Sequence, residues 1–299
     1  MKQALLAWIL WCAVTAANAL SPYTGASPVT GADLGAQMAA VEKKLQASGF
    51  ELLGRHVPKG LAKAGGVVLV TDPAMRQIIR DIGGSAIVAA PIRVAVHRDG
   101  RVSYMTPEYW YRAFLRKQYP KAESAVSAIQ TRLTQSLGTG SGFGGDVPTE
   151  RLADYQYMMS MERFDAIRSE LRAFVSFDEA IRTVRRTLGA GVGSTAKVYE
   201  LVMPEKRVAV FGVALNDTDR GEAWWVNKLG PTGPDHLAAL PYEIFVVGNK
   251  VYSLAGRYRI ALGWPALGLG DFMNIRYAPD VIQSTMDKLA EVPELQPSN

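Results

Sequence analysis

LPYEIFVVGNKVYS, residues 240–253, repeats the pattern of an earlier stretch, APIRVAVHRDGRVSY, residues 90–104. In each stretch a proline precedes alternating apolar residues, a two-residue turn and a second apolar run. Asp99-Gly100 suits a type I′ turn and Gly248-Asn249 suits a type II′ turn, so both stretches are predicted to form β-hairpins. A pattern that occurs twice indicates an internal duplication, in which each copy serves as a control for the other.

The residues that precede the two hairpins also follow one order, namely a helix, two strands and a second helix. In the first copy the predicted elements are a helix over 32–48, strands over 50–57 and 67–71, and a helix over 73–82. In the second copy they are a helix that begins at the capping box Ser176–Glu179, strands over 196–203 and 207–215, and a helix over 221–229. Further helices are predicted from Pro107, over 121–137 and over 279–291. This order is typical of an antiparallel α+β fold rather than of a doubly wound parallel sheet.

The chain divides into six segments by composition and pattern. They are a signal peptide at 1–19, a flexible leader at 20–31, repeat one at 32–137, a linker with inserted elements at 138–175, repeat two at 176–292 and a tail at 293–299. The glycine-rich run at 138–145 does not fit a phosphate-binding loop, because no strand precedes it and no Lys-Ser or Lys-Thr pair follows it. We expect this run to be a flexible connector.

The first 19 residues have the pattern of a secretory signal peptide. Lys2 gives the positive start, residues 4–14 the apolar core and Ala17-Asn18-Ala19 the cleavage site. Cleavage after Ala19 predicts a periplasmic or secreted protein, and it removes Cys12, the only cysteine. The formal charge of +5 comes from scattered basic residues, which argues against nucleic acid as a partner. No later segment is long and apolar enough to predict a membrane span.

Around the two hairpins the chain resembles the family catalogued as domain of unknown function 302 (DUF302), here in tandem. The residues that carry the resemblance are Pro91-Ile92-Arg93-Val94 and Tyr104-Met105-Thr106-Pro107 in the first copy and 236–243 in the second. The resemblance covers about residues 35–115 and 175–275. It implies a fold similar to that of TATA-box-binding proteins (TBP-like), with a curved antiparallel sheet and helices on one side. It implies no catalytic residue.

Both faces of the second hairpin carry large apolar residues, so we expect its sheet to be covered on both sides. The cover would come from the other repeat or from the inserted residues 116–174. We therefore predict an α+β protein in which two tandem repeats of a TBP-like antiparallel sheet with helices pack as an internal pseudodimer.

A candidate ligand site follows from extending the second hairpin outward from its turn at Gly248-Asn249. The extended pairing places His236, Arg257 and Arg259 on one face, with Tyr242 in the same cleft. Arginine holds anions and carboxylates through a fixed fork of donors. These four residues are therefore the candidate site for a small anionic or amphipathic ligand.

The comparison of the two copies supports this interpretation, because Ala86 stands in the first copy where the second has His236. A histidine in one copy alone is expected if that copy became a site and the other a scaffold. The alternative is a partly buried structural histidine, with arginines that are exposed or paired with carboxylates.

The same alignment places Arg93 and Glu243 at equivalent positions of the two copies. If the sheets associate about a pseudo-twofold axis, the two residues are able to form an ion pair across the seam. The alternative is that both lie on the surface, where an ion pair contributes little to stability.

Metal and nucleophilic chemistry find little support in the sequence. Met158, Met159 and Met161 lie together, and thioether sulfur suits copper(I), although packing in the core is the ordinary role of such residues. The three histidines lack ligand spacing, and the mature chain has no cysteine for a zinc site. No Gly-x-Ser-x-Gly motif is present. We expect no cofactor.

Three functions are compatible with these observations. The first is a non-catalytic binding module for a small anionic or amphipathic ligand at His236, Tyr242, Arg257 and Arg259. The second is an enzyme of undefined class that uses His236 as acid or base. The third is an envelope interaction or assembly protein that binds a partner through Trp224-Trp225 and the inserted helices. The ligand, the partner protein and the oligomeric state stay open.

Overall fold

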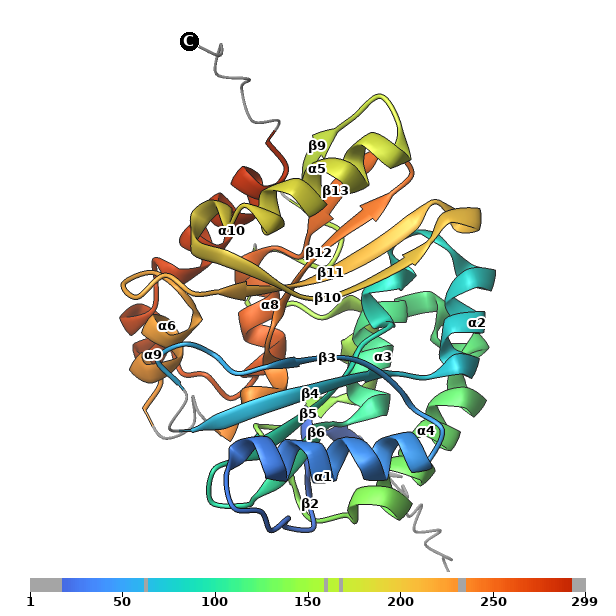
Figure 1. The fold of residues 1–299 in the computed structure, drawn as a ribbon, viewed down its shortest axis with the longest axis vertical. Helices are drawn as coiled ribbons and strands as arrows, with labels where there is room; N and C mark the ends of the chain where they lie inside the picture. The colour runs from blue at the N-terminus through green and yellow to red at the C-terminus, as the bar shows by residue number, and fades with distance from the viewer. Residues whose placement is uncertain (1–17, 62–63, 159–160, 167–168, 231–234, 292–299) are drawn as a thin grey trace, which may run out of the picture.

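The computed structural model describes residues 18–61, 64–158, 161–166, 169–230 and 235–291 of the chain. Two antiparallel sheets lie one above the other, with helices around them (Figure 1). In the six-stranded sheet the order is β3 (Glu51–His56), β4 (Gly65–Thr71), β5 (Ile92–His97), β6 (Val102–Met105), β2 (Tyr23–Ala26) and β7 (Gly142–Phe143). In the five-stranded sheet it is β10 (Thr195–Met203), β11 (Val208–Leu215), β12 (Tyr242–Val247), β13 (Lys250–Ser253) and β9 (Glu170–Ala173). The predicted α+β class with antiparallel sheets is confirmed.

Helices cover the outer sides of the two sheets. In the view of Figure 1, α1 (Leu34–Ala47) lies below the six-stranded sheet, and α5 (Phe177–Gly189) and α10 (Ala278–Leu289) lie above the five-stranded one. The other helices are α2 (Pro73–Ile82), α3 (Pro107–Leu115), α4 (Glu123–Leu137), α6 (Glu222–Lys228), α8 (Gly256–Gly263) and α9 (Leu269–Asn274). Short 3₁₀ turns include η1 (Gly84–Ala89), η2 (Arg116–Lys121), η3 (Thr149–Asp154), η5 (Val192–Ser194), η6 (Pro204–Lys206) and η7 (Leu237–Ala239). The two-residue strands β1 (Ala19–Leu20) and β8 (Val147–Pro148) pair with each other.

Local sequence signals explain where several of these helices begin. Asp33 accepts a hydrogen bond from the Ala36 amide at 2.8 Å, which caps α1. Asp72 caps α2 in the same way, and Pro73 occupies the first turn of that helix. The Ser176 hydroxyl accepts from the Glu179 amide at 3.1 Å and caps α5.

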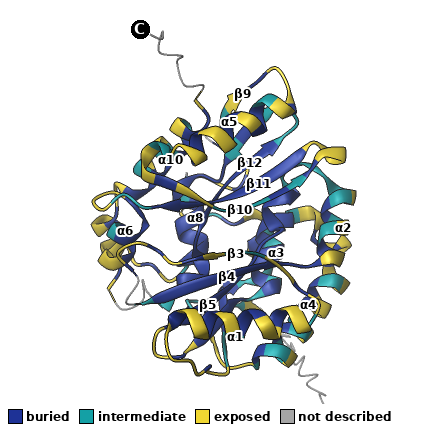
Figure 2. Cartoon of the chain, in the orientation of Figure 1, coloured by how far each residue is buried: buried dark blue, intermediate teal, exposed yellow. Residues whose placement is uncertain are grey.

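On the inner sides of the two sheets, a short turn from each sheet packs against the strands of the other. The turn η1 precedes β5 and packs against β11 and β12 of the other sheet. The turn η7 precedes β12 and packs against β4, β5 and β6. The strands β3 and β10 also lie against each other. One core therefore joins both sheets, and Figure 2 shows their central strands as buried.

The second hairpin has the predicted register near its turn but not beyond it. Val246 pairs with Val251 and Ile244 with Ser253, as predicted. The ladder ends there, and residues 256–263 form α8, so the predicted pairing of residues 255–259 with 238–242 is wrong. The chain leaves the sheet as a helix because this segment buries its apolar residues that way, as α3 does after the first hairpin.

The leader and the glycine-rich connector also differ from expectation. Tyr23–Ala26, within the expected flexible leader, forms β2 and pairs with both β6 and β7. The connector supplies β7, and the Gly140 amide donates to the Gly25 carbonyl at 2.8 Å. Both segments are ordered because β2 covers the otherwise open edge of β6 and β7 covers that of β2.

The signal peptide expected at 1–19 lies, up to residue 17, outside the described residues, as does the expected tail at 293–299. Within the part of the chain that is described, no helix combines the length and the apolar character needed to cross a bilayer.

Candidate functional site

The four predicted site residues lie on three different elements. His236 immediately precedes η7, Tyr242 begins β12, and Arg257 and Arg259 lie on α8. The Arg257 guanidinium is half-buried, 3.0 Å from Glu162 Oε1 and 3.4 Å from Asp280 Oδ1. The prediction that His236, Arg257 and Arg259 share one face of a hairpin is therefore wrong, because the arginines belong to a helix.

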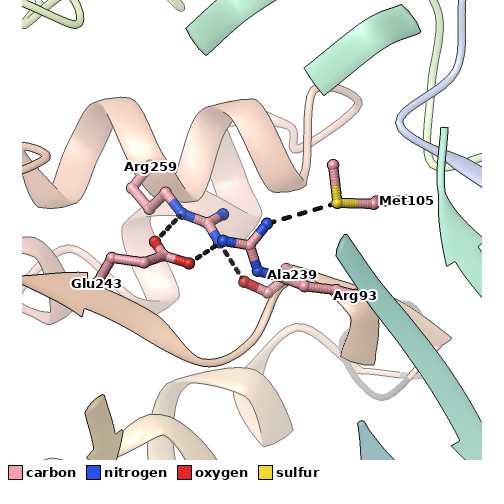
Figure 3. Close-up of polar contacts among 5 residues, drawn as sticks. All are labelled: Arg93, Met105, Ala239, Glu243 and Arg259. Atoms are coloured by element: carbon pink, nitrogen blue, oxygen red, sulfur yellow. Dashed lines mark hydrogen bonds and ion pairs between the residues drawn. The ribbon is translucent and has the colours of Figure 1, made fainter. Parts of the chain in front are cut away.

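Arg259 lies instead in a buried ionic cluster between the sheets (Figure 3). Its Nε lies 3.3 Å from Glu243 Oε2, and its Nη2 donates to the Ala239 carbonyl. Arg93, from β5 of the other sheet, donates through Nη2 to Glu243 Oε1. Arg93, Glu243 and Arg259 form what we call the seam cluster. The predicted ion pair between Arg93 and Glu243 is present, and the surface alternative is wrong because both side chains are buried.

The seam cluster carries two guanidinium groups and one carboxylate. Burial and the nearby Arg259 guanidinium lower the pKa of Arg93 to about 9, so it stays protonated at neutral pH. The ring of Trp110 lies 4.9 Å from Arg259 Cζ and 5.8 Å from Arg93 Cζ, which compensates part of the lost hydration. The Tyr242 ring lies 5.6 Å from Arg259 Cζ. With its three side chains withdrawn from solvent, the cluster holds the sheets together rather than meeting a dissolved substrate.

His236 lies in a different environment, on the wall of a pocket of about 360 Å³. The lining residues are Phe143, Gly144, Gly145, Asp235, His236, Trp264, Ala266, Leu267 and Asp271. The imidazole stacks on Trp264 at 5.4 Å and lies 5.8 Å from the Phe143 ring. Lysine and arginine are both missing from this lining within the described chain, so the predicted arrangement of a histidine with two arginines around an anion is wrong here.

The protonation state of His236 follows from its contacts. Nδ1 lies 3.1 Å from the Gly263 carbonyl oxygen, which only accepts hydrogen bonds, so Nδ1 carries the proton. Burial lowers the pKa of His236 to about 4, and the imidazole is neutral at pH 7. Nε2 is then a lone-pair acceptor, and no side chain or carbonyl of the described residues forms a hydrogen bond with it.

The glycine-rich connector forms one wall of this pocket. A Cβ atom at Gly144 would lie 3.3 Å from His236 Cε1 and 2.7 Å from Pro22 Cγ. A Cβ atom at Gly145 would lie 2.7 Å from that of Ala266. Both glycines also have a φ of 104°, which L side chains rarely adopt. The run at 138–145 therefore needs glycine in order to pass close to the histidine.

A second, larger hollow of about 680 Å³ has no counterpart among the predicted sites. Its apolar residues include Phe164, Phe245 and Tyr252, and the last two stack at 5.4 Å. Its charged residues are paired within the protein, since Arg116 lies 3.0 Å from Asp165 and Lys250 lies 2.9 Å from Glu170. Side chains alternate along β12, so Phe245 lies on the same face as Glu243.

Sequence reasoning also missed a buried pair between the halves of the chain. His56, at the end of β3, lies with Nε2 2.6 Å from Oε1 of Glu222, the first residue of α6. Both side chains are almost fully buried. No local pattern indicates the pair, because its members are far apart in the chain and neither belongs to a motif.

The remaining candidates give no site. Met158 is exposed and Met161 packs against the core, whereas Met159 lies outside the described residues, so the copper(I) hypothesis stays untested. In the described ranges no three His, Cys, Asp or Glu side chains are grouped closely enough to hold a metal ion. Trp225 is fully buried, and Trp224 is partly buried with Lys228 Nζ 4.5 Å from its ring centroid.

Comparison of the chain with protein-family models, with curated proteins and with solved structures found no match.

Proposed function

We propose that this protein is a binding module that holds a small amphipathic molecule in the pocket beside His236 and does not transform it. One observation carries the proposal. A nearly buried, neutral histidine offers an unpartnered acceptor on the wall of a pocket with aromatic sides. Pockets of this kind, mostly apolar with a few fixed polar groups, are typical of small-molecule sites.

Binding fits the surroundings of His236 better than catalysis does. A general acid or base works best when its pKa lies near the working pH, and burial lowers the pKa of His236 to about 4. The hydrogen bond from Nδ1 to the Gly263 carbonyl fixes the ring in one tautomer. Both features favour a fixed acceptor over a proton shuttle, which makes the enzyme the weaker alternative.

We further propose that the scaffold is a tandem repeat related to DUF302, with two TBP-like sheets packed as an internal pseudodimer. Three observations support this. The strand orders β3-β4-β5-β6 and β10-β11-β12-β13 correspond, η1 and η7 reach the opposite sheets reciprocally, and Arg93 and Glu243 occupy equivalent ladder positions. The proposal includes export to the periplasm or the medium, which rests on the sequence of residues 1–19.

A partner protein is the second candidate, and a different observation favours it. Leu269, Met273 and Tyr277 are exposed on and just after α9, the helix that supplies Asp271 to the same pocket. Such an apolar patch suits contact with an envelope protein. It is also a better candidate surface than Trp224-Trp225, which is largely covered.

Native mass spectrometry of the protein isolated from its own cells tests the binding function. We expect a small molecule to co-purify with the wild type. The variant Ala266→Trp fills the pocket from an exposed position and should lose this molecule, whereas Arg257→Ala, outside the pocket lining, should retain it. Equal occupancy in wild type and Ala266→Trp would place the ligand elsewhere and overturn the proposal. A folded wild type that neither carries a small molecule nor gains thermal stability from any member of an amphipathic library would also overturn it.

A further inference from the structure

The polar side chains that line the His236 pocket are all hydrogen-bond acceptors, and this restricts the class of ligand that fits. We infer that the pocket selects an organic ammonium ion with an apolar or aromatic body, an inference that rests on the proposed binding function. The arrangement that carries it is an acceptor nitrogen and two carboxylates around aromatic walls, with no basic residue among the described lining.

His236 supplies the buried part of the recognition. The side chain is 95 % withdrawn from solvent, with 5 % of its surface exposed. Because Nδ1 donates to Gly263, Nε2 is left as an acceptor, and only a ligand group that carries a hydrogen satisfies it. A carboxylate or phosphate oxygen would meet this nitrogen lone pair to lone pair. An ammonium N–H is a complementary donor.

Two carboxylates supply the charge. Asp271 lines the pocket from α9, and none of the ion pairs among the described residues involves it. Asp235 also lines the pocket and shares its charge with Arg101, whose Nη1 lies 3.0 Å from Asp235 Oδ1. The charged side chains of the described lining are therefore both carboxylates, which attract a cation and repel an anion.

The walls fit an apolar body attached to that cation. Phe143, Trp264 and Leu267 provide aromatic and aliphatic surface, and aromatic faces attract ammonium groups. The volume of about 360 Å³ lies in the lower part of the range for small-molecule pockets. A bare metal ion is disfavoured, because His236, Asp235 and Asp271 are not grouped closely enough to coordinate one ion.

The glycine-rich connector and the difference between the copies agree with this role. Gly144 and Gly145 let the main chain close one wall against the histidine, as the contacts of their virtual Cβ atoms show. The first copy has Ala86 at the position equivalent to His236, and Ala86 is buried in the core. The acceptor is thus present in one half alone.

Isothermal titration of the full chain at pH 7 with three matched probes tests the inference. The probes are 2-phenylethylamine, which is a cation, 2-phenylethanol, which is neutral, and phenylacetate, which is an anion. We expect the amine to bind about tenfold more tightly than the alcohol and phenylacetate to bind least, in line with the free energy of one charge-assisted hydrogen bond. An alcohol or phenylacetate that binds as tightly as the amine overturns the charge preference but leaves a binding pocket in place.

Two variants locate the preference. Asp271→Asn keeps the shape and removes the charge, and we expect it to weaken amine binding several-fold while binding of the alcohol changes little. Asp81→Asn is the matched control, because Asp81 is exposed on α2, on the other side of the molecule (Figure 1). His236→Phe keeps a ring but removes the acceptor nitrogen. It should therefore weaken the binding of both the amine and the alcohol, since each of them donates a hydrogen bond. If none of the three probes binds, native mass spectrometry decides. A co-purifying amine supports the inference, and any other co-purifying molecule overturns the inference alone. An empty protein overturns the inference, and it overturns the proposed function as well if no member of the amphipathic library raises the thermal stability.

Discussion

Arg93 and Glu243 stand 150 residues apart in the sequence, yet Arg93 donates directly to the Glu243 carboxylate between the two sheets. Each occupies the corresponding position of its own sheet, because Arg93 lies opposite Leu69 in the β4–β5 ladder and Glu243 lies opposite Gly212 in the β11–β12 ladder. The two residues are complementary in charge, whereas two identical copies of either half would place like charges against each other. Arg93 against a second arginine, or Glu243 against a second glutamate, would bury like charges.

The neighbouring positions in the two ladders are complementary in size as well. Next to Leu69 the six-stranded sheet has Gly54, whereas next to Gly212 the five-stranded sheet has Tyr199. The Tyr199 ring occupies the space that a side chain at position 212 would need. Charge and volume thus differ in the same row of both sheets, so each half fits the other better than it fits a copy of itself.

Removal of the Glu243 carboxylate from the seam cluster should lower the stability of the protein. In Glu243→Gln, Arg93 and Arg259 would stay buried without a counter-charge, and we expect the free energy of unfolding to fall by about 3–5 kcal/mol. Urea denaturation followed by tryptophan fluorescence measures this change. Glu205→Gln, which breaks the exposed ion pair with Arg80, is the control and should leave the transition almost unchanged. Similar midpoints for the two variants would show that the seam cluster does not hold the sheets together.

Gly212→Ala should destabilise the protein by overpacking. The new Cβ would lie 2.2 Å from Tyr199 Cε1, which forces the ring or the strand to move at a cost of about 1–3 kcal/mol. The double variant Gly212→Ala/Tyr199→Ala removes the clash but leaves a cavity, so its two substitutions should be clearly non-additive. Gly189→Ala, where no neighbouring atom lies within 4 Å, should be neutral or slightly stabilising. Additive thermal denaturation data for the double variant would contradict the packing argument.

The buried contact between His56 and Glu222 should behave as a coupled pair. His56→Leu leaves the Glu222 carboxylate in the core without its partner, and we expect a loss of about 3 kcal/mol or more. His56→Leu/Glu222→Leu replaces both polar groups with apolar ones and should recover much of that loss. A double-mutant cycle in guanidinium chloride gives the coupling energy, and a value near zero would mean that the two residues act independently.

The stability of the fold should depend on the protonation of His236. Burial lowers its pKa from 6.5 to about 4, so between these values the unfolded chain binds more protons than the folded one. The contribution is fully present above pH 6.5 and is lost progressively as the pH falls through 4, with a span of about 3 kcal/mol. Asp235, itself paired with Arg101, opposes the shift, and Asp271 lines the same pocket.

Nuclear magnetic resonance of the histidine side chains checks this expectation. The ring protons of His236 should keep their neutral shifts down to about pH 5, whereas a histidine in water titrates near pH 6.5. His236→Phe identifies the signals and should remove this part of the pH dependence. A His236 midpoint near 6.5 would contradict the expectation that burial lowers the pKa of this histidine.

The sequence by itself determined the features that depend on neighbours along the chain. The caps at Asp72 and Ser176, the turn at Gly248-Asn249 and the register next to it follow from short-range hydrogen bonding and from the two-residue period of strands. The equivalence of Arg93 and Glu243 also came from the sequence, because it required only an alignment of the two copies.

Tertiary structure alone decided how those elements meet. Arg259 points into the seam cluster, Tyr23 lies in the strand that covers the edge of β6, and His56 contacts Glu222. These contacts form because the burial of side chains stabilises contacts between residues that are distant in the chain. The pocket beside His236 likewise combines a glycine-rich connector, a 3₁₀ turn and the residues around α9. Local preferences set each element, but the free energy of burying charge and apolar surface is a property of the whole packed molecule, which no single stretch of sequence contains.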